Sequence, residues 1–200
     1  MRTGARMRHH AEETAVIVAV PEAEPVVGGF RAAHDPAAGW GVGAHVTVLS
    51  PFLAPDALDA TALADLAAAI ASVPRFTAEL TAARWFGDQV LWLAPEPGDA
   101  FRALTAAVWA RFPACPPYEG RHADVIPHLT VGDSAPVERL RAAQAAIEPL
   151  LPVRFAVTSA RLIRGRAAPD SWTTVAELPL CAPRPGWKSG TGHRHFERPA

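Results

Sequence analysis

The sequence of 200 residues has few cysteines, no long apolar run and almost no net charge. Its two cysteines, Cys115 and Cys181, are too few and too far apart for a disulfide framework or a paired-cysteine zinc site. Reduced thiols fit a cytoplasmic location best. The apolar run at residues 16–20 is far shorter than a membrane span and ends at Pro21, so neither a signal peptide nor a transmembrane helix is expected.

Charge is distributed unevenly along the chain, although the formal net charge is only −1. Residues 1–10 and 182–200 are basic, and the body between them is acidic. Duplex nucleic acid is bound by neutralising many phosphates, and an acidic body offers no broad basic surface for that purpose. Any phosphate site is therefore expected to be local.

A single domain is expected, because a chain of this length with half of its residues apolar is enough for one core of ordinary size. We predict a flexible segment at residues 1–12, a two-lobed domain at residues 13–181 and a flexible basic tail at residues 182–200. The tail is rich in Pro, Gly and charge and has no apolar period.

Hydrophobic patterning predicts alternating strands and helices. Strands are expected at residues 14–20, 45–50, 75–86, 89–95, 127–132, 153–165 and 171–180. Helices are expected at residues 24–34, 55–73, 98–112 and 136–151. The order strand, helix, strand, helix, strand in residues 14–86 recurs in residues 89–164. This recurrence predicts two similar βαβαβ halves related by a pseudo-twofold axis.

The pattern His-x-Thr-Val occurs at equivalent places in both halves, as "HVTV" from His45 and as "HLTV" from His128. Side chains alternate along a strand, so each His and Thr share one face while the apolar residues take the other. Imidazole can accept or donate a proton near neutral pH, and threonine hydroxyls can donate hydrogen bonds to phosphoryl oxygens. Two such pairs at one cleft would supply the acid, the base and the hydrogen-bond donors that phosphodiester cleavage requires, without a metal ion.

The paired motifs resemble the signature of the two-histidine phosphoesterase superfamily, and the chain is most similar to its 2'-5' RNA ligase-like branch. The segments "HVTVLSPFL", "FGDQVLWLAPEP", "PYEGRHADVIPHLTVG" and "SWTTVAELPL" carry this likeness, which covers roughly residues 14–180. The resemblance implies a bilobal α+β fold, in which two antiparallel sheets flanked by helices surround a central cleft. It further implies that His45 and His128 are the catalytic acid and base, and that Thr47 and Thr130 hold the phosphate.

The activity that the resemblance implies is hydrolysis of a 2',3'-cyclic phosphate or reaction at a 2'-5' phosphodiester linkage. No cofactor and no metal are expected. Histidine pairs near the two ends of the chain lack the partner cluster of a designed metal site: His9, His10, His193 and His195. The "GWGVGA" segment lacks the lysine and the following helix of a phosphate loop.

Other side chains are candidates for binding substrate at the cleft. Three of them are aromatic residues in loops or at turn edges, which would offer a stacking surface for a base: Trp40, Phe86 and Tyr118. Three arginines and one histidine are further candidates for contacting phosphate: Arg84, Arg121, Arg164 and His122. Packing is the expected role of Trp92, because it alternates with Leu91 and Leu93 inside a strand.

The expected partner is a nucleotide or RNA end that carries a 2',3'-cyclic phosphate, or a 2'-5' linked substrate. We expect a monomer that binds neither duplex nucleic acid nor membrane. The acidic body favours a small cyclic nucleotide or an RNA end over a polynucleotide. One alternative is a nucleotide-binding protein that uses the same cleft without turnover. The other is an interaction domain, in which His45 and His128 would lie more than roughly 10 Å apart.

Overall fold

The computed structural model describes residues 11–121 and 124–182. Apart from residues 11, 12 and 182, the flexible ends expected from the sequence therefore lie outside the described residues. The candidate His122 and the four terminal histidines also lie outside them. Within the described ranges, no helix is both long enough and apolar enough to cross a membrane.

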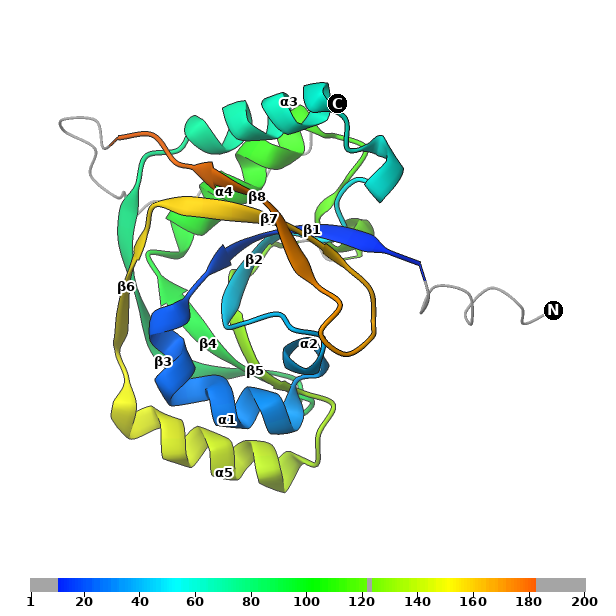
Figure 1. Ribbon diagram of the computed structural model, residues 1–200. Coiled ribbons are helices and arrows are strands. Elements are labelled where there is room, and N and C mark those ends of the chain that lie inside the picture. Colours follow the sequence, from blue (N-terminus) through cyan, green and yellow to red (C-terminus); the bar gives the residue numbers. More distant parts are fainter. Residues whose placement is uncertain (1–10, 122–123, 183–200) are drawn as a thin grey trace.

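Two four-stranded antiparallel sheets form the centre of the molecule (Figure 1). The first has the order β2-β1-β7-β8, from the strands His45–Leu49, Glu13–Ala19, Ser159–Gly165 and Thr173–Pro179. The second has the order β5-β4-β3-β6, from the strands Leu129–Asp133, Val90–Glu96, Phe76–Phe86 and Val153–Val157. The predicted α+β class with two antiparallel sheets is confirmed.

The one strand expected at residues 153–165 is wrong, because the structure has two strands there, and they belong to different sheets. The reason is visible in the burial pattern. Buried residues lie on odd positions up to Val157, whereas the next two buried residues, Ala160 and Leu162, lie on even positions. This change of phase at Thr158 marks the point where the chain leaves the second sheet for the first.

The two sheets have equivalent strand orders, but they are not the two halves of the sequence. Strands β1 and β2 correspond to β4 and β5, as the repeat predicts. Strand β3 of the first repeat, however, lies in the second sheet, and β7 of the second repeat lies in the first sheet. Each half of the sequence therefore contributes its third strand to the other sheet.

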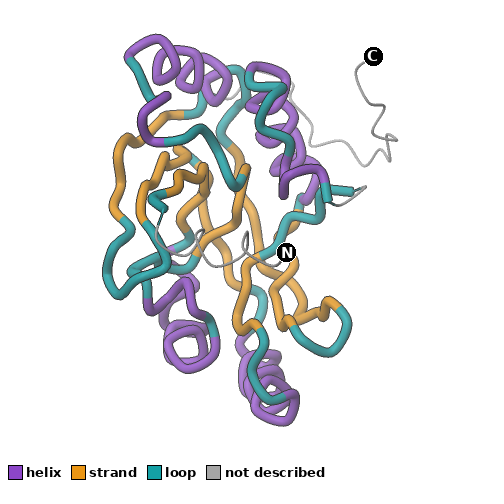
Figure 2. The backbone as a smooth tube through the Cα atoms, turned by 90° about the vertical axis from the view of Figure 1, so that its right-hand side faces the viewer, coloured by secondary structure: helices purple, strands orange, loops and turns teal. Residues whose placement is uncertain are grey.

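Two groups of helices cover the sheets. Helices α3 (Ala60–Ala71) and α4 (Gly98–Arg111) pack together at the first sheet, where α4 contacts β2 and α3 contacts β8. Helices α1 (Glu24–His34) and α5 (Val137–Ile147) lie together at the second sheet, where α1 contacts β5. Figure 2 shows the strands between these two groups of helices. Helix α1 of the first repeat thus packs on β5, the His-x-Thr strand of the second repeat, and helix α4 of the second repeat packs on β2, the His-x-Thr strand of the first.

Short helical turns connect the longer elements: η2 (Pro21–Ala23), α2 (Pro36–Gly39), η3 (Pro55–Ala57), η4 (Pro117–Gly120) and η5 (Glu148–Leu150). The helix expected at residues 55–73 begins later than predicted. Its N-cap is Asp59, whose side chain accepts a hydrogen bond from the Ala62 amide, and η3 forms a separate turn before it.

The apolar residues of both motifs belong to one hydrophobic core. Val46 and Val48 of β2 and Leu129 and Val131 of β5 are at most 3% exposed. The histidine and threonine of each motif are half-buried instead. Alternation along the two strands therefore separates the apolar and polar faces as the sequence predicts.

Candidate functional site

The two His-x-Thr segments lie on strands β2 and β5, which are edge strands of their sheets and contact each other. His45 is the first residue of β2, and His128 directly precedes β5. In each segment the histidine and threonine lie on the face opposite to the core, which we call the histidine face of that sheet. The fold therefore brings together two motifs that are far apart in the sequence.

Both imidazoles make the same kind of hydrogen bond to the main chain. Nδ1 of His45 lies 2.8 Å from the oxygen of Gly43, and Nδ1 of His128 lies 2.7 Å from the oxygen of Ile126. A carbonyl oxygen only accepts, so Nδ1 carries the proton in each neutral ring. Nε2 of each ring is then left with a free lone pair that can accept a proton.

Burial lowers the pKa of both histidines. The pKa of His45 falls to about 4, chiefly because burial disfavours the charged ring, while the hydrogen bond to Gly43 opposes this effect. The positive charge of Arg31 and that of His128 lower the same pKa, and the Asp35 carboxylate raises it. Burial also lowers the pKa of His128. Both imidazoles are therefore neutral at neutral pH before a substrate binds.

A buried ion pair connects the second motif strand to the loop that precedes the first. Arg31 of α1 is 1% exposed, and its Nη2 lies 2.8 Å from the carboxylate of Asp35. Its Nε donates to the main-chain oxygen of Thr130, and its Nη2 donates to that of Val42, both at 3.1 Å. One guanidinium is thereby fixed both to the second motif and to the loop that leads into the first.

Two further side chains anchor β2. Glu24 of α1 accepts a hydrogen bond from the amide of Ala44, the residue before His45. Thr105 of α4 is buried, and its hydroxyl donates to the oxygen of Val48 at 2.8 Å. The sequence patterns do not identify these anchoring residues, which are Arg31, Asp35, Glu24 and Thr105. The spacing of four residues between Arg31 and Asp35, at the end of the helix expected at residues 24–34, is the signal in the sequence.

Aromatic side chains surround His128. The ring of Phe86 meets it edge-on at 5.0 Å between centroids, and the ring of Tyr118 lies nearly parallel to it at 6.4 Å. Trp92, for which only packing was expected, stacks on Phe86 at 4.7 Å and lies 5.9 Å from His128. Burial raises the pKa of Tyr118, so its hydroxyl stays protonated. The fold thus brings Phe86 and Tyr118 to the second motif, whereas Trp40 lies at the end of α2.

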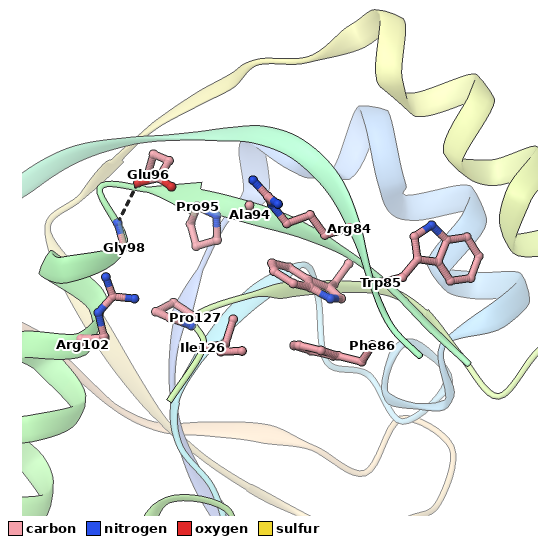
Figure 3. Close-up of a pocket in the computed structure, with 11 residues that line it drawn as sticks. Arg84, Trp85, Phe86, Ala94, Pro95, Glu96, Gly98, Arg102, Ile126 and Pro127 are labelled. Carbon is pink, nitrogen blue, oxygen red and sulfur yellow. Dashed lines mark hydrogen bonds between the residues drawn. The ribbon is translucent and has the colours of Figure 1, made fainter. Parts of the chain in front are cut away.

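The three candidate arginines are placed differently. Arg84 of β3 lines a cavity of about 640 Å³ (Figure 3), and Pro127, the residue before His128, lines the same cavity. Arg121 is exposed and forms an ion pair with Glu119. Arg164 forms an ion pair with Glu12. Of the three, Arg84 is the one that the structure brings to a cavity next to a motif histidine.

The strand register identifies another arginine in the first sheet. Thr47 of β2 lies opposite Ile17 of β1, and Ile17 lies opposite Arg161 of β7. Directly opposed residues point to the same face of a sheet, so Arg161 belongs to the histidine face. Arg164 lies three positions further along and therefore points to the other face.

Metal-binding groups do not gather in the part of the chain that the structure describes. No three His, Cys, Asp or Glu side chains of these residues are grouped so that they could hold a metal ion. Cys115 and Cys181 are free thiols.

Comparison with known proteins identifies a matching family and solved structures with a similar fold. A family model described as the 2'-5' RNA ligase superfamily matches residues 19–169. The structure of Escherichia coli LigT complexed with 3'-AMP is similar with a TM-score of 0.55 and 19% sequence identity, covering 86% of this chain and 99% of LigT. TT0787 of Thermus thermophilus gives a TM-score of 0.55 and 20% identity, covering 86% of this chain and 100% of that protein. At these identities the structures show a shared fold. No curated protein matches the sequence significantly.

Proposed function

The chain belongs to the 2'-5' RNA ligase superfamily, and from this premise we propose that it is a metal-independent phosphoesterase. Its substrate is a 2',3'-cyclic phosphate on an RNA end or small nucleotide, or a 2'-5' phosphodiester linkage. The observation that carries this proposal is the pair of His-x-Thr segments on contacting strands, each with a free Nε2 atom. A bound 3'-AMP in LigT agrees with it, because opening a 2',3'-cyclic phosphate gives a nucleoside 2'- or 3'-phosphate.

The two histidines divide the proton transfers. His45 has the pKa of about 4 and is the neutral base, whose Nε2 takes a proton from the attacking water. His128 is the acid and gives a proton to the ribose oxygen as the bond between that oxygen and phosphorus breaks. The negative charge of the bound phosphate raises the pKa of His128 and so favours the protonated ring that the acid requires.

The two threonines and the two main-chain carbonyls support these steps. Thr47 and Thr130 share the histidine faces with His45 and His128, and their hydroxyls donate hydrogen bonds to the non-bridging phosphoryl oxygens. The main-chain oxygens that accept from Nδ1 hold each ring in place and stabilise its protonated form.

The experiment is a turnover assay in the presence of a metal chelator. Nucleoside 2',3'-cyclic monophosphates and 2'-5' linked dinucleotides are incubated with the wild type and with His45→Ala, His128→Ala and His34→Ala, and products are separated by chromatography. Loss of either motif histidine is expected to lower kcat by about 10²- to 10⁴-fold, because each provides general acid or base catalysis. His34→Ala is the matched control, because His34 lies at the end of α1 outside the proposed site.

Two results contradict the proposal. One is full turnover by both motif variants. The other is saturable nucleotide binding by the wild type with no product after long incubation, which would identify a nucleotide-binding protein.

A further inference from the structure

The cavity beside His128 extends away from the two motifs. It has a volume of about 640 Å³, which is in the range of small-molecule sites, and it lies between β3, β4, the start of α4 and the segment that precedes His128. Figure 3 shows Arg84 on β3 and Arg102 on α4 at this cavity, with Phe86 and Ile126 next to each other. A phosphate held by the two histidines would therefore lie next to an additional space.

The strand register relates this cavity to the proposed phosphate position. Thr130 of β5 lies opposite Trp92 of β4, and Trp92 lies opposite Arg84 of β3. Two strand spacings separate Thr130 from Arg84 on the same face, which is roughly 10 Å between their main chains. The long side chain of Arg84 therefore starts about the length of one nucleoside from the reacting phosphate.

Two polar groups beside the cavity have no partner among the residues that the structure describes. Within the described residues, no carboxylate forms an ion pair with Arg84, whereas Arg102 is paired with Asp99. Trp92 is only 6% exposed, and its buried indole Nε1 has no hydrogen-bond partner within residues 11–121 and 124–182. A guanidinium recognises phosphate oxygens, and an indole N–H donates to an acceptor. The exposed guanidinium of Arg84 therefore suits an anionic, oxygen-rich ligand.

The rest of the wall is formed by apolar side chains and by Glu96, whose carboxylate accepts a hydrogen bond from the Gly98 amide. Phe86 is half-buried and stacks with one face on Trp92. Ile126 is 45% exposed and stands at the same cavity with Pro127. Exposed aromatic and aliphatic side chains of this kind support the base or ribose of a nucleotide.

The equivalent place in the first sheet is filled. There Ile17 occupies the position of Trp92, and it packs with Ala15, Val42, Ile163, Ala37 and Trp172 in a small apolar cluster. The remaining cavity is about 100 Å³, and Arg161 lies 4.0 Å from the carboxylate of Glu177. Of these two equivalent places, the one in the second sheet combines the larger cavity with an arginine that has no paired carboxylate among the described residues.

We propose that this cavity is a subsite for a second phosphate one nucleoside away from the reacting phosphate, and that Arg84 binds it. The preferred substrate is then a nucleotide that also carries a 5'-phosphate, as the last residue of an RNA end does, and not a nucleoside cyclic monophosphate alone. The inference rests on the proposed function, because it places the reacting phosphate at the two His-x-Thr segments.

The test compares ligands that differ by one phosphate. Dissociation constants of adenosine 3'-monophosphate and adenosine 3',5'-bisphosphate, and of the two corresponding 2' isomers, are measured by calorimetry for the wild type, Arg84→Gln and Arg161→Gln. The wild type is expected to bind a bisphosphate about tenfold or more tightly than the monophosphate, as one charge-assisted contact allows. The preference disappears in Arg84→Gln and persists in Arg161→Gln, the matched arginine of the other sheet.

The subsite is contradicted if the wild type binds the monophosphate and the bisphosphate with equal affinity, or if binding of the bisphosphates is undetectable. It is also contradicted if the preference for the bisphosphate survives in Arg84→Gln. Loss of the preference in both variants also overturns it. Because these are binding measurements, they separate the subsite from the proposed activity. A bisphosphate preference without turnover of any cyclic or 2'-5' linked substrate would support the subsite and contradict the proposed activity. Turnover without the bisphosphate preference would support the activity and contradict the subsite.

Discussion

Nε of Arg31 donates a hydrogen bond to the main-chain oxygen of Thr130, although the two residues are separated by 99 positions in the chain. The same guanidinium binds the oxygen of Val42, three residues before His45. A single buried side chain of α1 is thus bonded both to the second motif and to the loop that leads into the first. The relative position of the two motifs depends on this contact as well as on the sheets.

Replacing Arg31 is expected to destabilise the protein strongly. Arg31→Met keeps much of the side-chain volume but leaves Asp35 buried without its partner, and breaking a buried ion pair in this way costs about 3–5 kcal/mol. Urea denaturation measures the loss in the free energy of unfolding. The control is Arg164→Met, whose exposed ion pair with Glu12 contributes about 0–1 kcal/mol. Similar losses in the two variants would contradict the anchoring role of Arg31.

Arg31 and Asp35 are expected to affect the pKa of His45 in opposite directions. Arg31 lowers that pKa and Asp35 raises it. Asp35→Asn should therefore lower the pKa of His45 further, and Arg31→Met should raise it, as followed by NMR titration of the imidazole. Arg31→Lys keeps the positive charge and should leave the pKa closest to that of the wild type. A general loosening of the fold would raise the pKa toward 6.5 in every variant.

The pH dependence of kcat/KM is expected to reach its maximum in weakly acidic solution. The base must be neutral, so activity is lost as the pH falls through the His45 pKa of about 4. The acid must be protonated, so activity is lost as the pH rises through the His128 pKa, which burial lowers from 6.5. Steady-state kinetics with a cyclic nucleotide should give an optimum of kcat/KM between these limits.

The optimum of kcat should lie at a higher pH than that of kcat/KM, because kcat reports the complex, in which the phosphate charge raises both pKa values. An optimum of kcat/KM above about pH 7.5, well beyond the unperturbed histidine pKa, would show that these two rings do not carry the proton transfers.

Removing either threonine hydroxyl is expected to lower kcat with little change of stability. Thr47→Val and Thr130→Val keep the side-chain shape and remove one hydrogen-bond donor to the charged transition state, a loss of about 10²-fold or more for a single donor. Thr77→Val is the matched control, because Thr77 is an exposed strand residue of β3 that faces solvent. A KM increase at unchanged kcat would instead indicate that the hydroxyls bind substrate and transition state equally.

Local patterns in the sequence predicted the elements and the motif residues. Alternation in "HVTV" and "HLTV" fixed which side chains are buried, and Val46 and Val131 are indeed in the core. The exchange of β3 and β7 between the sheets could not be read in the same way, because pairing of distant strands depends on tertiary packing.

The other residues around the candidate site were harder to predict for two reasons. Arginine is rarely buried unless it is paired, so the role of Arg31 depends on a partner and two carbonyl oxygens that only the fold brings together. Which of Arg161 and Arg164 points to the histidine face depends on strand register. The sequence is ambiguous there, because the neighbouring residues Leu162 and Ile163 are both buried.

The central claim is that His45 and His128 act on one phosphate as a single unit, and a double-mutant cycle tests it most directly. Rates of cyclic phosphate hydrolysis are measured for His45→Ala, His128→Ala and the double variant. Groups that act as a unit are strongly non-additive, so the double variant is expected to be no more than a few-fold slower than the slower single variant. Losses in the double variant that equal the product of the two single losses would contradict the claim, since they would show that the histidines act independently.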